Sequence, residues 1–578
     1  FDLGIVVTVD GAKIPLSSMI TALACGDSHL LLPDGRYFDL HSPTLTKLRE
    51  LIDEARSLQD APDGPLRLTR YQAGLWEELA AHGVVTRQAK AWRTQVSGLL
   101  ALGGIEPAVA PSGLDATLRS YQGEGLSWLS FLYEHGLGGI LADDMGLGKT
   151  IQTLALITRV QETSGISAPF LIVAPSSVVH NWAREAQRFT PGLKIATAAE
   201  TVLRRGTTID ELAGGADIVI TSYTIFRLDF DDFDSVSWSG LILDEAQYVK
   251  NHQAKSYQCA RRLAAPFKLA ITGTPMENNV MELWSLLSIA APGLFPSPKK
   301  FTDLYRKPIE QGGDTAVLEQ LRRRIKPLVL RRTKDLVVAD LPPKQEQTVE
   351  VDLHPRHRKL YDTTLNRERQ KILGLIDDLD KNRFTILKSL TLLRQLSLDP
   401  TLVDEKHATI PSAKTEELVA QLTEIAAGGH RALVFSQFTR YLGRVRDRLS
   451  AVGIEFEYLD GKTSNRAAVV ERFREGDAPV FLISLKAGGV GLTLTEADYC
   501  FVLDPWWNPA TEMQAVDRAH RIGQTKTVFV NRYVSRGTIE EKVMALKERK
   551  AKLIAGVMDN GTTFDGGLTA DDIRALIE

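Results

Sequence analysis

The stretch Leu141-Ala142-Asp143-Asp144-Met145-Gly146-Leu147-Gly148-Lys149-Thr150 joins a short apolar segment to a helical pattern. We predict a strand over residues 139–142 and a helix over residues 151–160, and this order of strand, glycine-rich loop and helix is typical of a phosphate-binding loop. The backbone N–H groups of residues 146–150 would face the phosphates at the helix N-terminus, where unpaired N–H groups and the helix dipole favour anions. Lys149 would reach the outer phosphates, and the Thr150 hydroxyl would hold Mg²⁺.

The loop departs from the strict G-x-x-x-x-G-K-[ST] pattern at one position, where Asp143 stands in place of glycine. Taken alone, it is equally compatible with a glycine-rich helix start that binds no ligand. A second signal favours function, because a buried strand ends in the adjacent carboxylates Asp244 and Glu245. We predict that Asp244 coordinates Mg²⁺ and that Glu245 polarises the attacking water as general base.

Short apolar runs alternate with helical stretches from about residue 113 onward, which is typical of parallel strands buried on both faces. A first set of predicted strands comprises residues 139–142, 170–174, 217–222, 240–243 and 269–272, and a second set comprises residues 431–435, 455–459, 480–484, 500–503 and 527–533. Between the two sets, residues 281–425 lack strand alternation and are rich in helix formers. The sequence therefore predicts an α/β protein with two parallel-sheet lobes and helical insertions.

The first part of the chain has a different pattern. Residues 7–14 and 31–38 alternate around Asp-Gly turns and are predicted to form hairpins, and apolar spacing over residues 75–84 predicts a helix. We assign an α+β accessory domain to residues 1–112, the first lobe to residues 113–345 with a helical insertion near its end, the second lobe to residues 346–555 with a helical insertion at its start, and a C-terminal tail to residues 556–578.

Composition excludes several classes of protein. The hydrophobic share of 44% and the charged share of 24% are ordinary for a globular chain. Cys25, Cys259 and Cys500 form no CxxC pair, which excludes a disulfide framework and a cysteine zinc site. No apolar run approaches the roughly 20 residues that span a bilayer, so we expect a cytoplasmic protein. Because Phe1 rather than Met begins the chain, we also expect it either to be processed or to be part of a longer protein.

Further segments carry polar and glycine-rich patterns in a distinctive order. They are Leu118-Arg119-Ser120-Tyr121-Gln122, Ile271-Thr272-Gly273-Thr274-Pro275, Ser484-Leu485-Lys486-Ala487-Gly488-Gly489-Val490-Gly491-Leu492, Asp504-Pro505-Trp506-Trp507-Asn508-Pro509 and Gln514-Ala515-Val516-Asp517-Arg518-Ala519-His520-Arg521-Ile522-Gly523-Gln524. Together with the phosphate loop and residues 241–247, they resemble the motifs of SWI/SNF-type ATPases of helicase superfamily two, in the bacterial, RNA-polymerase-associated-like branch. The resemblance covers about residues 118–552, and the family's own phosphate loop carries the aspartate seen here at Asp143.

The resemblance implies two RecA-like lobes and an ATP hydrolase that uses ATP with Mg²⁺. It implies catalytic roles for Lys149, Asp244, Glu245, Arg518 and Arg521; ATP contacts from Gln122, Asp143, Met145, Gly146, Leu147, Gly148, Lys149, Thr150 and Gly491; Mg²⁺ ligation by Thr150 and Asp244; and coupling of hydrolysis to movement by Gly273, Thr274 and Gln514. Gln122 would read adenine, and Arg518 and Arg521 would contact the γ-phosphate as arginine fingers. Since these arginines are three residues apart, both would project from one face of a helix.

The resemblance also implies translocation on double-stranded DNA without strand separation, by a monomeric motor that remodels or displaces DNA-bound proteins. The DNA contacts that it implies are Pro175, Ser176, Ser177, Thr221, Ser222 and Tyr223 in the first lobe, and Ser436, Gln437, Lys462, Lys486, Thr493 and Trp506 in the second. Small hydroxyls and backbone amides suit phosphates, which carry no sequence information. RNA polymerase or another DNA-bound complex is the partner suggested, and the expected location is the bacterial nucleoid.

Two other functions remain open from the sequence. A strand-separating helicase shares the two-lobe engine but needs a wedge element, and no segment is identifiable as one. An interaction protein docked on a DNA-bound complex would use its ATPase only to switch conformation. Separately, Arg70-Tyr71-Gln72 also resembles the adenine-reading segment, but only Gln122 is followed promptly by a strand and the phosphate loop, so Gln72 is predicted to be an ordinary helix residue.

The charge pattern constrains how DNA would be bound. Lys plus Arg is 69 and Asp plus Glu is 72, which gives a net charge of −3 and no overall basic footprint. Residues 321–334 carry a basic run, Arg322, Arg323, Arg324, Lys326, Arg331, Arg332 and Lys334, which is a weak candidate for DNA contact. We therefore expect narrow basic and hydroxyl tracks, with a modest affinity that depends on salt and nucleotide state.

Overall fold

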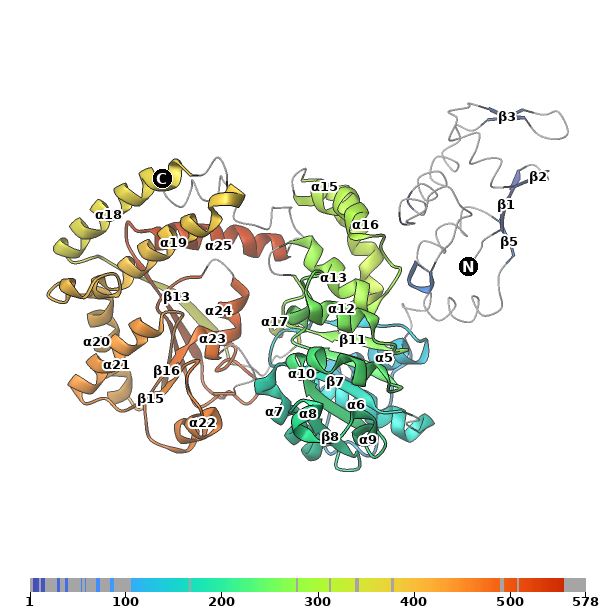
Figure 1. Cartoon of the computed structure of the whole chain (residues 1–578), viewed down its shortest axis with the longest axis horizontal. Helices are drawn as coiled ribbons and strands as arrows, with labels where there is room; N and C mark the ends of the chain where they lie inside the picture. The colour runs from blue at the N-terminus through green and yellow to red at the C-terminus, as the bar shows by residue number, and fades with distance from the viewer. Residues whose placement is uncertain are drawn as a thin grey trace. The chain divides into compact units, whose positions relative to one another are not determined.

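The computed structural model describes residues 4–9, 12–15, 29–31, 37–39, 54, 58, 69–72, 84–87, 105–165, 168–276, 279–310, 313–337, 342–375, 379–488, 493–506 and 509–555. The chain divides into two compact units, of which one comprises residues 1–144 and 148–332, and the other comprises residues 145–147 and 333–578. Each unit contains one large parallel sheet with helices packed on it (Figure 1). Within the described residues, no helix is both long and apolar enough to cross a membrane.

The sheet of the first unit has the order β12-β6-β11-β10-β7-β9-β8, and all of its pairings are parallel. Its strands are β6 (Gly139–Leu141), β7 (Phe170–Ala174), β8 (Ile195–Ala198), β9 (Ile218–Ser222), β10 (Gly240–Asp244), β11 (Lys268–Ile271) and β12 (Val329–Leu330). Every residue of β6, β7 and β9 is buried, because helices cover both faces of the sheet. The five strands predicted for this lobe are confirmed within one residue at each end.

The helices of the first unit alternate with its strands and then form a helical insertion after β11. They are α5 (Ser120–Glu134), α6 (Lys149–Ser164), α7 (Ser176–Phe189), α8 (Val202–Arg205), α9 (Ile209–Ala213), α10 (Tyr223–Leu228), α11 (Phe230–Asp234), α12 (Lys255–Arg262), α13 (Val280–Ala290), α14 (Pro298–Phe301), α15 (Lys307–Glu310) and α16 (Thr315–Ile325). Short 3₁₀ segments η3 (Ala246–Val249) and η5 (Lys326–Leu328) follow β10 and α16, and one π-helical turn, η4 (Thr302–Arg306), lies between α14 and α15.

The sheet of the second unit has the order β13-β18-β17-β14-β16-β15 and is also parallel throughout. Its strands are β13 (Lys344–Val351), β14 (Ala432–Ser436), β15 (Phe456–Leu459), β16 (Val480–Ser484), β17 (Tyr499–Val502) and β18 (Val528–Ser535). Its helices are α17 (Lys334–Val337), α18 (Pro355–Leu373), α19 (Leu379–Leu398), α20 (Ala413–Ala427), α21 (Thr439–Val452), α22 (Arg466–Glu475), α23 (Leu485–Gly488), α24 (Pro509–Val516) and α25 (Ile539–Ala555), with 3₁₀ turns η7 (Pro400–Leu402) and η8 (Glu405–His407). The five predicted strands are again present, with ends shifted by at most two residues.

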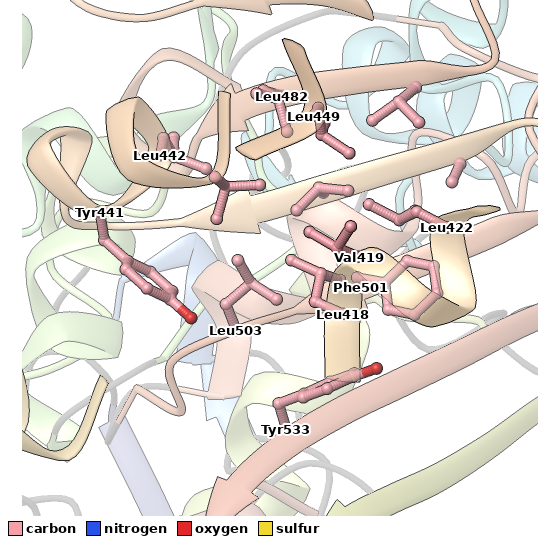
Figure 2. Packing of buried hydrophobic residues seen from close by; sticks show 14 of the residues in the cluster. Leu418, Val419, Leu422, Tyr441, Leu442, Leu449, Leu482, Phe501, Leu503 and Tyr533 are labelled. Atoms are coloured by element: carbon pink, nitrogen blue, oxygen red, sulfur yellow. The ribbon is translucent and has the colours of Figure 1, made fainter. Parts of the chain in front are cut away.

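The core of the second unit follows the twofold alternation of side chains along its strands. Val434 and Leu482 face the helices α20 and α21, where they join a cluster with Leu418, Leu442 and Phe501 (Figure 2). Their chain neighbours Leu433, Phe435 and Ile483 point to the opposite face and pack with Phe473 and Val516. Each such side chain contributes about 1.5–3 kcal/mol when it is removed from water. Both faces are therefore apolar, and this explains the continuous apolar runs in the sequence.

Two strands lie inside the interval of residues 281–425 that we predicted to lack strands, so that prediction was wrong there. β13 is an edge strand of eight residues whose first five are exposed, and it pairs in parallel with β18. The sequence of β13, Lys344-Gln345-Glu346-Gln347-Thr348-Val349-Glu350-Val351, contains no apolar run that would identify a strand. Its position is held by partners in β18, such as Arg532, which donates to Glu346 over 2.6 Å. β12 has only two residues, too few for any periodic signal.

Part of the N-terminal region is described. The hairpin predicted at Asp10-Gly11 is confirmed, since β1 (Gly4–Val9) pairs antiparallel with β2 (Ala12–Pro15). The second predicted hairpin is confirmed by the pairing of β3 (His29–Leu31) with β4 (Tyr37–Asp39). Val84 was predicted to end a helix, but it begins strand β5 (Val84–Arg87), which pairs with β1. The rest of that predicted helix and the tail at 556–578 lie outside the described residues.

Two contacts attach this region to the helical insertion of the same unit. Arg324 of α16 donates to both carboxylate oxygens of Glu54 over 2.7 and 2.9 Å, and both side chains are buried. Gln72, in the 3₁₀ turn η1 (Arg70–Gln72), donates to the Leu294 carbonyl over 3.1 Å. Gln72 is therefore a packing residue, as expected, although it lies in a 3₁₀ turn rather than an α-helix.

Candidate functional site

The phosphate loop has the backbone that its glycines permit. β6 ends at Leu141, and α6 begins at Lys149 after Gly148, which has φ 75° and ψ 44°. Gly146 also has a positive φ, 89°, in a region where residues with a side chain are strained. A Cβ added to Gly148 would lie 2.5 Å from Nε2 of Gln122. The structure therefore brings the predicted adenine-reading residue directly against the predicted phosphate loop.

Gln122 has a second, structural contact in this arrangement. Its side-chain oxygen accepts a hydrogen bond from the backbone N–H of Arg119 over 2.9 Å, at the start of α5. Its amide nitrogen lies 3.3 Å from the hydroxyl of Tyr121. The side chain is buried, so it is held in place by the fold before any ligand is present.

Lys149 lies among the carboxylates that the sequence predicted to surround it. Its Nζ donates to the carbonyls of Asp143 and Asp144 over 2.6 and 3.1 Å. Burial lowers the pKa of Lys149, and the nearby charges of Glu245, Asp143, Asp244 and Asp144 oppose that shift. The lysine of the β6–α6 loop and the two carboxylates after β10 therefore meet at one edge of the sheet.

Asp244 is held by three neighbours at the carboxyl end of β10. Its Oδ2 accepts from Nε1 of Trp182 over 2.7 Å, its Oδ1 accepts from the backbone N–H of Glu245 over 2.9 Å, and its carbonyl accepts from the Tyr223 hydroxyl over 2.8 Å. Burial and the adjacent charge of Glu245 raise the pKa of Asp244 to about 7. The Trp182 hydrogen bond and the charge of Lys149 oppose this shift, and the carboxylate is fixed in orientation.

Glu245 has an unusual backbone and leads into a chain of hydrogen bonds. Its φ of 48° makes it the one non-glycine residue with positive φ in the described part of the chain. Its Oε2 accepts from Nε2 of Gln247 over 3.0 Å, and Oε1 of Gln247 accepts from the Thr272 hydroxyl over 3.2 Å. That hydroxyl in turn accepts from the backbone N–H of Thr274 over 3.1 Å. The predicted general base is thereby connected to the predicted coupling residues, with Gly273 between the two threonines.

The donor set fits a nucleotide with Mg²⁺. Mg²⁺ is usually bound in such sites by one or two carboxylates together with substrate phosphates and waters. No group of three or more acidic, histidine or cysteine side chains that could hold a metal occurs in the described ranges. The charge of Lys149 acts on Asp244 and lowers its pKa, but burial and Glu245 outweigh that effect. Thr150 stands in the first turn of α6 on the loop side. Met145 and Leu147, the remaining predicted ATP contacts of this loop, are half-buried and buried, respectively.

The DNA contacts predicted in the first unit lie at the carboxyl ends of β7 and β9, but most of them are already engaged. The Thr221 hydroxyl donates to the Ala198 carbonyl, the Ser222 hydroxyl caps α10 at Ile225, and Tyr223 donates to Asp244. All three side chains are buried. In the structure these side chains hold the strand end and Asp244. Their role as DNA contacts stays a prediction. Pro175 is buried and Ser176 is exposed, and the Ser177 side chain lies outside the described residues.

In the second unit, Asp504 connects two strand ends. Its carboxylate accepts from the backbone N–H of Gln437 over 3.2 Å and from the Ser436 hydroxyl, and Ser436 is fully buried. Trp506 is half-buried, and the guanidinium of Arg394 lies 4.8 Å from the centre of its ring. Ser436 and Trp506 therefore contribute to the edge of the sheet, and their role as DNA contacts stays a prediction. The partly exposed Gln437 keeps that prediction.

The remaining residues predicted to bind in this unit differ in accessibility. Lys462 is exposed in the loop after β15. The Thr493 hydroxyl accepts from a guanidinium nitrogen of Arg521 over 3.0 Å, which pairs a predicted DNA contact with a predicted catalytic residue. Gly491 and the side chain of Lys486 lie outside the described residues.

Arg518 and Arg521 do not lie on a helix as predicted. α24 ends at Val516, and residues 517–523 form successive turns, so the two side chains are not placed by helical periodicity. The turns are held by Gln524, whose Nε2 donates to the carbonyls of Thr495, Ala497 and Ala519 over 2.9–3.1 Å. Arg518 is 2% exposed. The predicted coupling residue Gln514 lies on α24 itself.

Three of the seven cations in the basic run of residues 322–334 are used inside the protein. Arg324 pairs with Glu54, Arg332 with Asp143, and Lys334 with Asp517, and all three cations are buried. Lys334 also donates to the His520 carbonyl over 2.7 Å, next to Arg521. The run is thus not a free basic track, because most of its buried charge is matched by a carboxylate.

Several residues that hold the site were missed from the sequence. Trp182, Gln247 and Arg332 touch predicted site residues through side-chain hydrogen bonds, and Gln524 bonds the turns that carry Arg518 and Arg521. Gln247 and Gln524 stand inside motifs that we quoted, and a buried polar side chain beside a carboxylate or a turn is a recognisable signal. Trp182 and Arg332 lie far from their partners in sequence, and nothing local identifies them.

Comparison with known proteins agrees with this geometry. Residues 121–402 match the model of the SNF2-related domain, and residues 413–523 match that of the helicase conserved C-terminal domain. The chain belongs to the SNF2-related family of helicase-like ATPases. In this SNF2-related chain, the first match contains the phosphate loop and Glu245, and the second contains Arg518 and Arg521.

Named relatives include bacterial and animal proteins. The chain is 37% identical over 510 residues to the putative ATP-dependent helicase/translocase YwqA of Bacillus subtilis, which covers 86% of this chain and 54% of that protein. It is 36% identical over 464 residues to the mouse SWI/SNF-related matrix-associated actin-dependent regulator of chromatin subfamily A member 1, covering 78% and 44%. This SNF2-related chain therefore spans about half the length of these relatives.

Among solved structures, the chain is similar to the Sulfolobus solfataricus SWI2/SNF2 ATPase core in complex with dsDNA. The sequences are 32% identical, the match covers 81% of this chain and 99% of that one, and the TM-score is 0.41.

Proposed function

We propose that this chain is a DNA-dependent ATPase that translocates on double-stranded DNA without separating the strands, and that it thereby remodels or displaces DNA-bound proteins. The target that we propose is a DNA-bound protein complex such as RNA polymerase. ATP dependence rests on the site of the first unit and on membership of the SNF2-related family.

One observation carries the proposal: Lys149, Asp244 and Glu245 meet at the carboxyl edge of one parallel sheet. In open sheets of this kind, ligands bind at that edge. A lysine for phosphates, a buried carboxylate and a second carboxylate joined to Gln247 are the groups that nucleoside triphosphate hydrolysis needs. An unrelated structural ion pair would not require the positive φ of Glu245.

The residues have separate roles in this proposal. Bound Mg²⁺ would neutralise charge on the phosphates. Thr150 and Asp244 would hold that ion, with Asp244 kept in orientation by Trp182. Lys149 would exchange its loop carbonyls for phosphate oxygens. Glu245 would orient and deprotonate the attacking water, and Gln247 fixes the direction of its carboxylate.

The second unit supplies the remaining proposed catalytic groups. We assign Arg518 and Arg521 to stabilising charge that develops on the γ-phosphate, a role in which guanidinium groups have large effects on turnover. The turn that carries them is fixed by Gln524, which supports a precise placement. We propose that closure and reopening around the nucleotide alternate the grip on DNA.

The proposed DNA contacts are the accessible groups at the strand ends. Ser176, Gln437 and Lys462 are at least partly exposed and polar. Such groups read phosphates without sequence preference, as translocation requires. Double-stranded DNA is named with the Sulfolobus core, and YwqA is described as a helicase/translocase; we extend both descriptions to this chain as proposals.

The test is the ATPase rate with duplex DNA, single-stranded DNA and RNA in turn, together with two displacement assays. We expect duplex DNA to stimulate ATP turnover most, and the protein to displace a triplex-forming strand without unwinding the duplex beneath it. The control is Lys149→Ala, which should remove turnover with every nucleic acid.

Each alternative function gives a different result. Duplex unwinding would establish a strand-separating helicase instead of the proposed translocase. ATP turnover without any displacement would indicate an interaction protein that uses ATP only as a switch. Undiminished turnover in Lys149→Ala would overturn the assignment of the ATP site itself.

A further inference from the structure

Arg332 makes an unusually complete set of contacts just after β12. Its Nε donates to Oδ1 of Asp143 over 3.0 Å, and one terminal nitrogen donates to Oδ2 over 2.5 Å and to Oε1 of Gln152 over 2.7 Å. The other terminal nitrogen donates to the Tyr121 carbonyl. The backbone N–H of Arg332 also donates to Oδ1 of Asp143, over 3.1 Å. Guanidinium and main chain thus hold the same carboxylate.

The three partners belong to three different parts of the candidate nucleotide site. Tyr121 precedes Gln122 in the adenine-reading segment, and Asp143 opens the phosphate loop. Gln152 stands in the first turns of α6, where its Nε2 also donates to the Gly148 carbonyl over 3.2 Å. Since one planar guanidinium bonds all three, their relative positions are set by one side chain.

The surrounding space is shaped to this side chain. A Cβ added to Gly125 of α5 would lie 2.8 Å from the Arg332 guanidinium and 1.9 Å from Oε1 of Gln152. The Tyr121 ring lies 5.3 Å from the centre of the guanidinium, on another side. Arg332 is 8% exposed and Asp143 is fully buried, so water cannot replace either partner. A lysine could keep the charge here but not the forked geometry.

We propose that Arg332 is a positioning residue for the nucleotide. Through Asp143, Gln152 and the Tyr121 carbonyl, it fixes the phosphate loop and the Gln122 segment in the one arrangement that accepts adenine and phosphates together. Asp143, which stands where the strict motif has glycine, serves as the carboxylate anchor of that arrangement. The inference rests on the proposed function, because it presupposes that the site binds ATP.

Glycine at position 143 should therefore weaken nucleotide binding in this chain, although it restores the strict motif. Asp143→Gly leaves a buried guanidinium without its carboxylate, whereas the double variant Asp143→Gly with Arg332→Met removes both charges. If the two residues act as one unit, the effects of the single changes do not add. The double variant should then bind nucleotide better than Asp143→Gly alone.

The experiment measures binding and turnover in the full chain. The dissociation constant for a fluorescent ATP analogue, competition by ATP and GTP, KM and kcat, and the unfolding temperature are compared for wild type and Arg332→Lys. We expect Arg332→Lys to weaken ATP binding about tenfold or more, to reduce the preference for ATP over GTP, and to raise KM more than it lowers kcat.

The matched control is Arg324→Lys, in the same basic run. Arg324 is also a buried arginine with a forked bond to one carboxylate, but that carboxylate, Glu54, belongs to the N-terminal region and is not among the residues predicted to bind ATP. We expect it to lower the unfolding temperature as Arg332→Lys does and to leave ATP affinity and base preference unchanged. The contrast separates positioning of the nucleotide from general stability.

The results divide clearly. Wild-type ATP affinity and base preference in Arg332→Lys, or an equal loss in Arg324→Lys, would overturn the positioning role while the ATPase itself stands. Additive effects in the double variant would show that Asp143 is not the anchor. If the wild-type chain neither binds nor hydrolyses ATP, the proposed function fails, and the inference fails with it.

Discussion

At Glu245 the chain accepts an unfavourable backbone conformation. A left-handed φ of 48° in a residue with a Cβ costs about 1–2 kcal/mol. This conformation turns the chain directly after β10, so that Asp244 and Glu245 point from consecutive positions into the same region as Lys149. Strain of this kind persists where the surroundings hold it, here through Gln247 and Thr272.

The first prediction concerns the proposed general base. Glu245→Gln keeps the shape of the side chain and an acceptor for Gln247, but it removes the group that takes the proton. We expect nucleotide affinity to stay within about twofold of wild type and DNA-stimulated turnover to fall by about 10²–10⁴-fold. Equilibrium binding of a fluorescent ATP analogue and steady-state ATPase assays check both values.

A control variant separates this effect from loss of charge. Glu319→Gln alters an exposed glutamate on α16 of the same unit and should retain full turnover. Normal turnover in Glu245→Gln would rule out Glu245 as the base.

At the scale of elements, the loop after β17 is held by buried charges from three helices. Nζ of Lys414, on α20, donates to the Leu503 carbonyl over 3.0 Å, and Arg394, on α19, donates to the Pro505 carbonyl over 2.8 Å. Glu512, on α24, accepts from the backbone N–H of Trp506 over 2.8 Å. The helical insertion therefore serves to fix one short loop at the edge of the second sheet.

Asp504 lies within that loop, and its ionisation makes the stability of the folded protein depend on pH. Burial raises the pKa of Asp504 to about 7, and Arg394, 3.8 Å away, opposes the shift. The nearby charges of Glu540 and Lys414 pair with each other over 2.6 Å. Because the folded pKa lies above the unfolded value of about 3.9, the folded state binds the extra proton, and its contribution to stability is lost as pH rises from about 4 to about 7.

The second prediction follows from this loss of stability with rising pH. Arg394→Met removes the cation that favours ionised Asp504, so the pKa of Asp504 rises further and the loss of stability continues above neutral pH. We expect a cost of about 3–5 kcal/mol at about pH 8 and a smaller cost at about pH 5.5, where Asp504 is protonated in either protein. Denaturant midpoints at the two pH values measure it.

The matched control is a surface arginine of the same unit. Arg448→Met removes an exposed pair with Glu416 and should cost about 0–1 kcal/mol with little change between the two pH values. An equal cost of Arg394→Met at both pH values would contradict the role of Asp504 ionisation.

At the scale of the whole molecule, the charge balance has a structural explanation. A net charge of −3 gives no overall attraction to DNA, and three cations of the most basic segment, Arg324, Arg332 and Lys334, are engaged in buried pairs. In the proposed function, DNA binding would depend on a few exposed groups at strand ends, such as Lys462. Few contacts with phosphates would suit a motor that grips and releases.

The third prediction is a salt-dependent DNA affinity. The logarithm of the binding constant should fall linearly with the logarithm of salt concentration, by about 0.9 for each phosphate neutralised. Lys462→Ala should reduce that slope by about 1, whereas Lys542→Ala, an exposed lysine on α25, should not change it. Fluorescence anisotropy with a duplex between about 50 and 200 mM salt, with and without nucleotide, measures both. An affinity independent of salt would exclude contacts of this kind.

The sequence alone determined the two parallel sheets, the phosphate loop and the carboxylates after β10. These features depend on short-range patterns: strands buried on both faces appear as apolar runs, and a phosphate loop needs glycines and a lysine at fixed spacing. The polar edge strand β13 and the turns that carry Arg518 and Arg521 were not predictable in this way. Their geometry depends on partners in β18 and on Gln524, rather than on their own periodicity.

Tertiary structure alone decided which polar side chains hold the site and which remain free to bind. Thr221, Tyr223 and Ser436 are polar residues at strand ends, which is why the sequence indicated phosphate contacts. In the structure they are buried and bonded to the protein. Arg332 belongs to a basic run that the sequence marked as a candidate for DNA contact. In the structure it joins three segments of the candidate nucleotide site. The physical reason is that buried polar groups need partners, and those partners come from residues far apart in sequence that only the folded chain brings together.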